Sequence, residues 1–509
     1  MKRRLPPRRL ALVGAMVIGI VAGTPAVGRP ATLCTDICPS GTPCTISNAK
    51  SIVPGSRVDC SGIDIELLQF GKLQVTDGSF AVLAHSIFST NANSQIEAVA
   101  SGGGQVGGIR IEVETDFSFW GGVRADSAGP GGSVEIVAGR DILIPDQGEY
   151  GISVTGTGTG APGGDIQLSA GRDIVLGDPL ITDCAGSGEA NAGNIGLWAG
   201  GQIVTSGTGE LRAESRSTTG GAILLNATGN INVGAPVSAN GRQDHGDGGN
   251  IGISSTAGVT IGAALTARGG VNAGGDASSG GDVQIGAGCG GITVGSTIDV
   301  RSGDAGAHDG GMISLEAHGP VTLNSTALMD LRSTQPAGIA GTFVASSDQT
   351  LKFVGGAKVD ARGDASGHGR GGEIDLQGCV VTVEPSATFD VTAYEGGRIW
   401  LQARTSPTAT GVQPMTIREG SQLVANTNSG AQRAGAIWLD PVATKPGVCS
   451  TQMSLACSSD SQCPAVGCNP GHCLYANPDT DGVWSQFSII PTVHSTPSLP
   501  KGCSTTCVQ

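Results

Sequence analysis

Residues 164–176 read Gly164-Asp-Ile-Gln-Leu-Ser-Ala-Gly-Arg-Asp-Ile-Val-Leu176, and this stretch decides the fold. Its apolar residues alternate with polar or small ones in two short runs, and alternation with period two is typical of strands that bury one face. The pattern returns as Gly311-Met-Ile-Ser-Leu-Glu-Ala-His-Gly-Pro-Val-Thr-Leu323. A third short run follows, as in Ile298-Asp-Val300. The stretch therefore predicts a unit of three short strands.

The unit repeats along most of the chain, and each copy opens with a small residue followed by a Gly. That Gly is Gly132, Gly164, Gly193, Gly221, Gly249, Gly281, Gly311, Gly341 and Gly372, which gives eight intervals over 240 residues, a mean of 30. Three strands cannot bury their apolar faces alone, whereas stacked units align them into one core. The sequence therefore predicts an all-β fold, a right-handed parallel β-helix over 62–440 with three strands per unit and disulfide-stapled ends.

The composition excludes several other classes of protein. The chain has 85 Gly among 509 residues and only 3% aromatic residues, so it lacks the side chains that fill the core of an ordinary large enzyme. There is no Gly-X-Y period, which excludes collagen. Short Ile, Val and Leu clusters recur throughout, which argues against disorder.

The repeated pattern G-G-x-I-x-L-x-A…I-x-V…I-x-A-x-G resembles the β-helical stems of filamentous-haemagglutinin-like exoproteins and autotransporter passengers of bacteria. The resemblance covers about residues 62–440. It implies a secreted or surface β-helix, in a group that includes adhesins, toxin stems and passive scaffolds. The chain departs from that group because it shows no two-partner secretion motif and ends in a Cys-rich segment rather than in a barrel.

Residues 1–28 are expected to be a signal peptide. Five basic residues (Lys2, Arg3, Arg4, Arg8 and Arg9) precede a short apolar stretch, and small residues follow at 26–28. Export to the extracellular space or outer cell surface is expected, with the periplasm as the alternative. The remaining chain carries 24 Lys and Arg against 43 Asp and Glu, a balance that argues against nucleic-acid partners. No transmembrane anchor is expected in it.

Fourteen Cys in an exported chain indicate disulfides. Four lie in an expected N-terminal cap, 29–61, and seven in a Cys-rich C-terminal segment, 441–509. The candidates for disulfide bonds are Cys34, Cys38, Cys44, Cys60, Cys449, Cys457, Cys463, Cys468, Cys473, Cys503 and Cys507. Three more lie between these groups, so at least one bridge must cross segments if all are oxidised.

Charged residues form two columns on the third strand of the unit. The acidic column is Asp299, Asp330, Asp360 and Asp390, and the basic column, two residues later, is Arg301, Arg332 and Arg362. Stacking would place like charges one unit apart, and the neighbouring Arg residues would neutralise the carboxylates. We expect a solvated Asp/Arg lattice that the repeat duplicates, because a catalytic constellation would break the repeat.

The alternative is an active site of the β-helical polysaccharide-lyase or hydrolase type. There the carboxylates would hold Ca²⁺ and a basic residue would take the proton beside the sugar carboxylate. We expect no cofactor for the scaffold, and calcium enters only with this alternative.

Two Trp residues, Trp400 and Trp438, occupy the same outward position in consecutive units. They could stack on a sugar ring, although packing beneath the Cys-rich segment is the favoured interpretation. The sequence as a whole predicts an exported, non-enzymatic, adhesin-like scaffold at the bacterial surface, with polysaccharides or cell-surface glycans as candidate partners.

Overall fold

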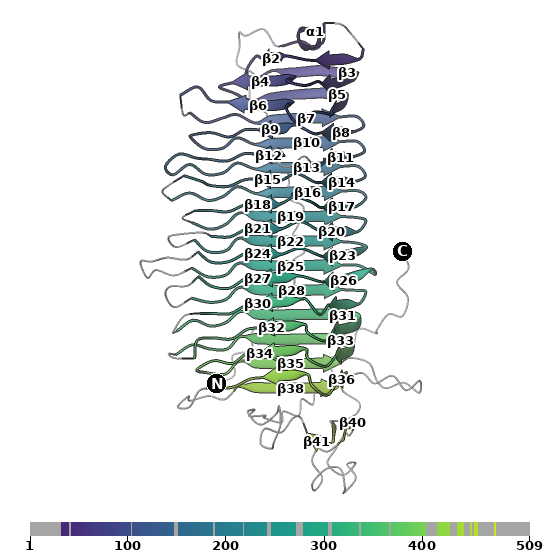
Figure 1. Ribbon diagram of the computed structural model, residues 1–509, viewed down its shortest axis with the longest axis vertical. Coiled ribbons are helices and arrows are strands. Elements are labelled where there is room, and N and C mark those ends of the chain that lie inside the picture. Colours follow the sequence, from purple (N-terminus) through teal and green to yellow (C-terminus); the bar gives the residue numbers. More distant parts are fainter. Residues whose placement is uncertain are drawn as a thin grey trace.

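The protein is a stack of short parallel strands that forms a long β-solenoid, as the computed structural model shows (Figure 1). The structure describes residues 32–39, 42–102, 104–146, 151–186, 189–216, 218–241, 246–270, 278–303, 308–334, 337–365, 368–403, 415–427, 435–441, 448–449, 452–456 and 473–474. The predicted signal peptide, residues 1–28, lies outside the described residues. The all-β parallel fold that the repeat predicts is confirmed.

The first two strands of each unit belong to one 24-stranded sheet. The first strands are β7 (Ile109–Val113), β10 (Val134–Ala138), β13 (Ile166–Ala170), β16 (Ile195–Ala199), β19 (Ala222–Ala227), β22 (Asn250–Ser255), β25 (Asp282–Ala287), β28 (Met312–Ala317), β35 (Arg398–Ala403) and β38 (Ala436–Pro441). The second strands are β8 (Phe117–Phe119), β11 (Ile142–Ile144), β14 (Ile174–Leu176), β17 (Ile203–Thr205), β20 (Ile231–Val233), β23 (Gly258–Ile261), β26 (Gly291–Val294), β29 (Val321–Leu323) and β36 (Met415–Ile417). Four long strands span both positions: β3 (Arg57–Leu67), β5 (Phe80–Ser89), β31 (Thr342–Phe353) and β33 (Glu373–Val383).

The third strands form a separate 14-stranded parallel sheet. They are β2 (Ala49–Ile52), β4 (Lys72–Thr76), β6 (Gln95–Val99), β9 (Gly122–Arg124), β12 (Ile152–Ser153), β15 (Leu180–Ile181), β18 (Leu211–Arg212), β21 (Val237–Ser238), β24 (Leu265–Thr266), β27 (Thr297–Asp299), β30 (Leu328–Asp330), β32 (Lys358–Asp360), β34 (Thr388–Asp390) and β37 (Gln422–Val424). Three strand positions per unit are therefore confirmed, and in four units one long strand fills the first two.

One hydrophobic core runs through the stack, from Ile37 to Ile437. Each inward side chain meets the equivalent side chain of the next unit, as Ile166, Ile195 and Ile223 do in β13, β16 and β19. Because every unit shares its core with its neighbours alone, the stability of the stack is a sum over neighbouring units.

The Gly that opens each unit is required by space. A Cβ on Gly164 would lie 1.5 Å from the carbonyl oxygen of Gly132, and one on Gly193 would lie 1.7 Å from that of Gly164. Consecutive units approach here through their backbones, so any side chain would push them apart.

The N-terminal end of the stack is closed by α1 (Cys34–Ile37) (Figure 1). Two disulfides, Cys34–Cys60 and Cys38–Cys44, fix this end. The four N-terminal cysteines therefore pair among themselves. Strand β1 (Cys44–Ile46) already pairs in parallel with β3, and β2 with β4. The parallel stack thus begins at Cys44, inside the segment 29–61 that the sequence assigned to a cap.

Cys289 and Cys379 are also disulfide-bonded. Their units are three ladder steps apart, from β26 through β29 and β31 to β33, which is about 14 Å at the usual strand spacing. Disulfides need Cα atoms within about 7 Å, so the two do not bond to each other. Cys184 is free and buried.

Beyond β38 the structure describes a small antiparallel sheet of β39 (Val448–Cys449), β40 (Gln452–Ala456) and β41 (Cys473–Leu474). The remaining disulfide candidates of this segment, Cys457, Cys463, Cys468, Cys503 and Cys507, lie outside the described residues. No helix within the described ranges is long and apolar enough to cross a membrane.

Candidate functional site

The acidic column lies where the repeat placed it, at the ends of β27, β30, β32 and β34. The strands pair so that Asp299, Asp330, Asp360 and Asp390 stand opposite one another. Thr266 of β24 occupies the same position in the preceding unit. The spacing of 30 or 31 residues in the sequence therefore becomes one strand spacing in the structure.

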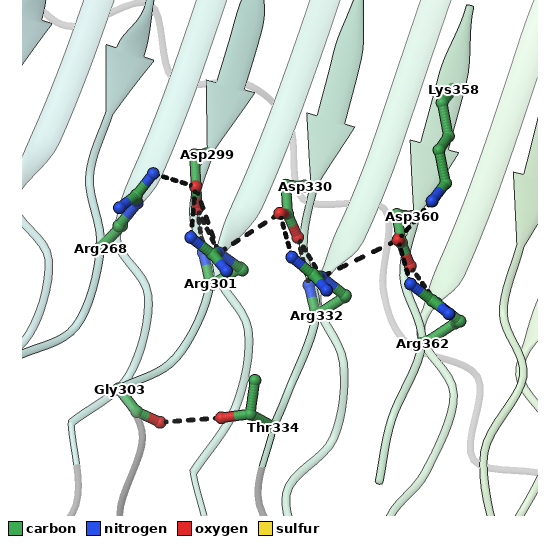
Figure 2. Close-up of polar contacts among 10 residues, drawn as sticks. All are labelled: Arg268, Asp299, Arg301, Gly303, Asp330, Arg332, Thr334, Lys358, Asp360 and Arg362. Atoms are coloured by element: carbon green, nitrogen blue, oxygen red, sulfur yellow. Dashed lines mark hydrogen bonds and ion pairs between the residues drawn. The ribbon is translucent and has the colours of Figure 1, made fainter. Parts of the chain in front are cut away.

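Three of these carboxylates are buried, which corrects the prediction of a solvated lattice. Asp299, Asp330 and Asp360 are 1%, 3% and 1% exposed. Their side chains point away from the hydrophobic core, but the guanidinium groups of the basic column cover them (Figure 2). The lattice is therefore a layer of buried ion pairs, with only the arginine side of each pair in contact with water.

Each of these three Asp residues is bound by the Arg two residues later in its own unit (Figure 2). Arg332 donates from Nε and Nη2 to the two oxygens of Asp330 at 2.9 and 2.8 Å. Arg362 binds Asp360 in the same bidentate way, at 2.7 and 2.7 Å. In this fork both carboxylate oxygens accept charge-assisted hydrogen bonds, which are the strong ones.

Each Arg also reaches the Asp of the following unit. Arg301 Nε lies 3.3 Å from Asp330 Oδ2, and Arg332 Nε lies 3.8 Å from Asp360 Oδ2. Arg268, which follows Thr266, starts the series with a 2.6 Å contact to Asp299 Oδ2. The ion pairs thus form one continuous ladder along the solenoid. We call these residues, with Arg362, Asp390 and Lys358, the Asp/Arg ladder.

The ladder weakens at its C-terminal end. Asp390 has Thr392 in place of an own-unit Arg, and it accepts a hydrogen bond from the Thr392 backbone N–H at 2.9 Å. Its contact with Arg362 Nε is 3.7 Å long, and its side chain is 18% exposed. Lys358 adds a cation to the centre of the ladder, 3.0 Å from Asp360 Oδ2.

The charges in the ladder stabilise one another. Burial by itself would raise the pKa of Asp360, but hydrogen bonds from Arg362 and Lys358 outweigh it and hold the pKa below its usual value. The hydrogen bond to Asp330 raises the pKa of Arg332, and the one to Asp360 raises that of Arg362. All three groups therefore remain ionised at neutral pH.

This arrangement does not suit a calcium-dependent lyase. Ca²⁺ takes six to eight oxygen ligands, and here the carboxylate oxygens of Asp330 and Asp360 are occupied by guanidinium groups. A divalent cation placed among them would meet the positive charges of Arg332, Arg362 and Lys358. A carboxylate with a lowered pKa inside an ion pair is also a weak general base.

Among the described residues, the group with the spacing of a metal site is Cys34, Cys38 and Cys60. All three sulfurs belong to disulfides. Since metals bind cysteine as the thiolate, this oxidised group offers no metal ligand.

Trp400 and Trp438 lie side by side, as the repeat predicted, because β35 and β38 pair in register. Both are half-buried, and Trp400 Nε1 is buried without a hydrogen-bond partner in the described part of the chain. The Arg398 guanidinium lies 6.0 Å from the centre of the Trp438 ring. The indole N–H of Trp400 is therefore not available to a sugar hydroxyl.

Sequence reasoning missed the extension of the ladder toward the N-terminus. Arg212 of β18 occupies the strand position that Asp299 occupies three units later, and it donates from Nε to Asp183 at 2.7 Å. Burial raises the pKa of Asp183. The order of acid and base is reversed here, so a search for Asp followed by Arg does not find it.

A second row of ion pairs was also missed, at the corner between the first and second strands. Arg140 donates from Nε to Asp116 at 2.8 Å, and Arg172 donates to Asp141 at 2.7 Å. The signal was present, since Gly-Arg-Asp-Ile occurs at 139–142 and again at 171–174. Both rows point to ion pairing between units as a general stabilising device of this chain.

Trp198 was the third omission. It is an exposed Trp on the outward face of β16, and Gly196 precedes it on the same face. Aligning the units on their opening Gly would have placed Trp198 beside Ser169 and Asn226, among uncharged neighbours.

A comparison of the chain with protein-family models, with curated proteins and with solved structures finds no match. The solenoid architecture and the geometry of its surfaces therefore carry the functional argument.

Proposed function

We propose that the protein is an exported, non-enzymatic structural rod with an adhesin-like role, on the bacterial cell surface or outside the cell. The observation that carries this proposal is the state of the ladder carboxylates. Asp299, Asp330 and Asp360 are buried and bound by arginines, and they follow the repeat from unit to unit. Such groups stabilise a stack, whereas catalysis requires a carboxylate that substrate can reach.

The rest of the described solenoid supports a structural role. Its core is a single cluster, and its strands pair in parallel with in-register partners along the stack. A stack of this kind is stiff, because bending it would open both the backbone ladder and the core. The disulfides Cys34–Cys60 and Cys38–Cys44 secure the terminal edge that would otherwise be open.

The enzymatic alternative is tested with the oxidised protein and a panel of acidic and neutral polysaccharides, in Ca²⁺ and in chelator. We expect no new reducing ends and no unsaturated sugars under either condition. Calcium-dependent release that Arg332→Ala abolishes and Asp390→Asn preserves would overturn the proposal and identify a lyase.

Export is tested separately, by fractionation of cells that express the full chain. The mature protein is expected outside the cytoplasm, with its N-terminus near residue 29. A full-length chain retained in the cytoplasm would contradict this part of the proposal and leave the polysaccharide assay unaffected.

A further inference from the structure

We propose that the outward face of β13, β16, β19, β22 and β25 binds an uncharged, extended polysaccharide chain. This goes beyond the structural role, because it names a binding surface and its ligand. The face, which we call the neutral face, consists of two columns that the strand register aligns. The columns are Gln167, Gly196, Leu224, Gly252 and Gln284, and Ser169, Trp198, Asn226, Ser254 and Gly286.

The centre of the neutral face is an aromatic ring laid along the sheet. Trp198 is 37% exposed. A Cβ on Gly196 would lie 2.1 Å from Trp198 Cη2 and 2.5 Å from Cζ3, so the six-membered ring lies directly over Gly196. Gly196 does not have a positive φ, and the room it leaves for the ring accounts for a Gly in the middle of a strand.

A second apolar side chain extends this platform. Leu224 stands opposite Gly196 in the next strand and is 42% exposed. A Cβ on Gly252, the following residue of the column, would lie 2.8 Å from Leu224 Cδ2. Gly196 therefore leaves room for the Trp198 ring, and Gly252 leaves room for Leu224. Together the ring and Leu224 form an apolar surface that lies flat on the sheet.

The neutral face carries no charged residue in either column across five strands. Its nearest charges along the stack are Glu135, opposite Gln167, and Glu316, opposite Gly286. Asp165 and Asp282 lie at its lateral edge, directly before β13 and at the start of β25. An acidic polymer would find no cation here and would be repelled by a chain of formal net charge −14.

These features fit a neutral glycan better than a protein partner. The C–H bonds of a pyranose ring pack on the electron-rich face of an indole. The amides of Gln167, Asn226 and Gln284 can both donate to and accept from sugar hydroxyls. Four strand spacings make the face about 19 Å long, enough for a few sugar residues. A stable protein interface buries about 800 Å² per partner around an apolar core, whereas the large apolar side chains exposed in these two columns are Trp198 and Leu224.

The test uses the full oxidised protein and measures co-sedimentation with insoluble cellulose and chitin. It adds affinity electrophoresis through soluble xylan and galactomannan, with polygalacturonate as the acidic probe. We expect retention on at least one neutral probe and none on polygalacturonate. Trp198→Ala should weaken that binding at least tenfold, and Trp400→Ala, the matched control, should leave it unchanged.

A second variant tests whether binding depends on where the Trp198 ring lies, and not only on whether Trp198 is present. Gly196→Ala keeps Trp198 but displaces its ring, so it should weaken binding to the same probe and shift the emission of the Trp198 indole. Unchanged thermal unfolding in both variants will show that the solenoid is intact.

Three outcomes would overturn the proposal. They are the absence of binding to every neutral probe, equal binding by the wild type and Trp198→Ala, and a concentration-dependent dimer that Trp198→Ala abolishes. The last would make the neutral face an interface between copies of the chain. None of these outcomes bears on the cleavage assay, so the structural proposal stands or fails separately.

Discussion

Replacing Asp330 with Asn should destabilise the centre of the solenoid much more than the same change at Asp390. Asp330 is 3% exposed and accepts two hydrogen bonds from the Arg332 guanidinium, with Arg301 Nε 3.3 Å away. Hydrogen bonds to charged groups contribute about 1.5–3 kcal/mol each, and breaking a buried ion pair costs about 3–5 kcal/mol. Asn retains one acceptor oxygen.

The arginines left behind reduce this cost, because water reaches them. The side chains of Arg301 and Arg332 are 27% and 32% exposed. We therefore expect Asp330→Asn to cost about 2 kcal/mol. Asp390 has one 3.7 Å ion pair and a more exposed side chain, so Asp390→Asn should cost less than about 0.5 kcal/mol.

Hydrogen exchange is the appropriate assay, since a stack of repeats does not unfold as one two-state unit. Amides in β27, β30 and β32 should exchange roughly 25- to 30-fold faster in Asp330→Asn, which corresponds to about 2 kcal/mol. Amides in β13 and β16 should be unaffected. Equal exchange in the two variants, or no change in either, would refute the conclusion that the buried pairs stabilise the stack.

Three further predictions concern pH, packing and the disulfides. The pKa of Asp360 is lower folded than unfolded, so its contribution to stability is present above about pH 4 and is lost as the pH falls through the folded value. The unfolding temperature should therefore fall less steeply below about pH 4 in Asp360→Asn than in the wild type. Phe353 is fully buried, and Phe353→Ala should cost about 3–5 kcal/mol, measured by hydrogen exchange of the β31 and β33 amides, whereas Phe70→Ala, at an exposed site, should cost less than about 0.5 kcal/mol. Joint replacement of Cys34 and Cys60 by Ser removes a bridge across 26 residues and should cost about 3.5 kcal/mol, with faster exchange confined to the N-terminal strands.

The register of the solenoid could be predicted from the sequence, because the opening Gly and the period of two fix which residues stack. Asp299 and Asp330 stand opposite each other as their spacing requires. The start of the stack is harder to read from the sequence, because the unit of β3 has Pro54 where the next two units have Gly78 and Gly107. The sequence placed the boundary at 62, whereas the parallel stack begins at Cys44.

Burial of the ladder carboxylates could not be predicted, because it depends on how the Arg side chains lie. A strand position that faces outward is normally solvated, and nothing in the pattern says that Arg332 turns back over Asp330. Trp198 differs, because the sequence already places it two residues after Gly196 on one strand face. The sequence therefore allowed the prediction that Gly196 leaves room for the Trp198 ring on the outward face.

The direction of the Asp/Arg ladder has a consequence for how such a chain can change its length. Arg301 and Arg332 each bind the Asp of their own unit and the Asp of the following one. A duplicated copy of 30 residues inserted between these units would bring an Asp for the arginine before it and an Arg for the aspartate after it. The rod can therefore grow or shrink in whole units without leaving an uncompensated charge at either junction. A copy taken from outside the ladder would interrupt the series of ion pairs and leave one arginine without its carboxylate in the following unit. Only units that carry both the Asp and the Arg are therefore interchangeable.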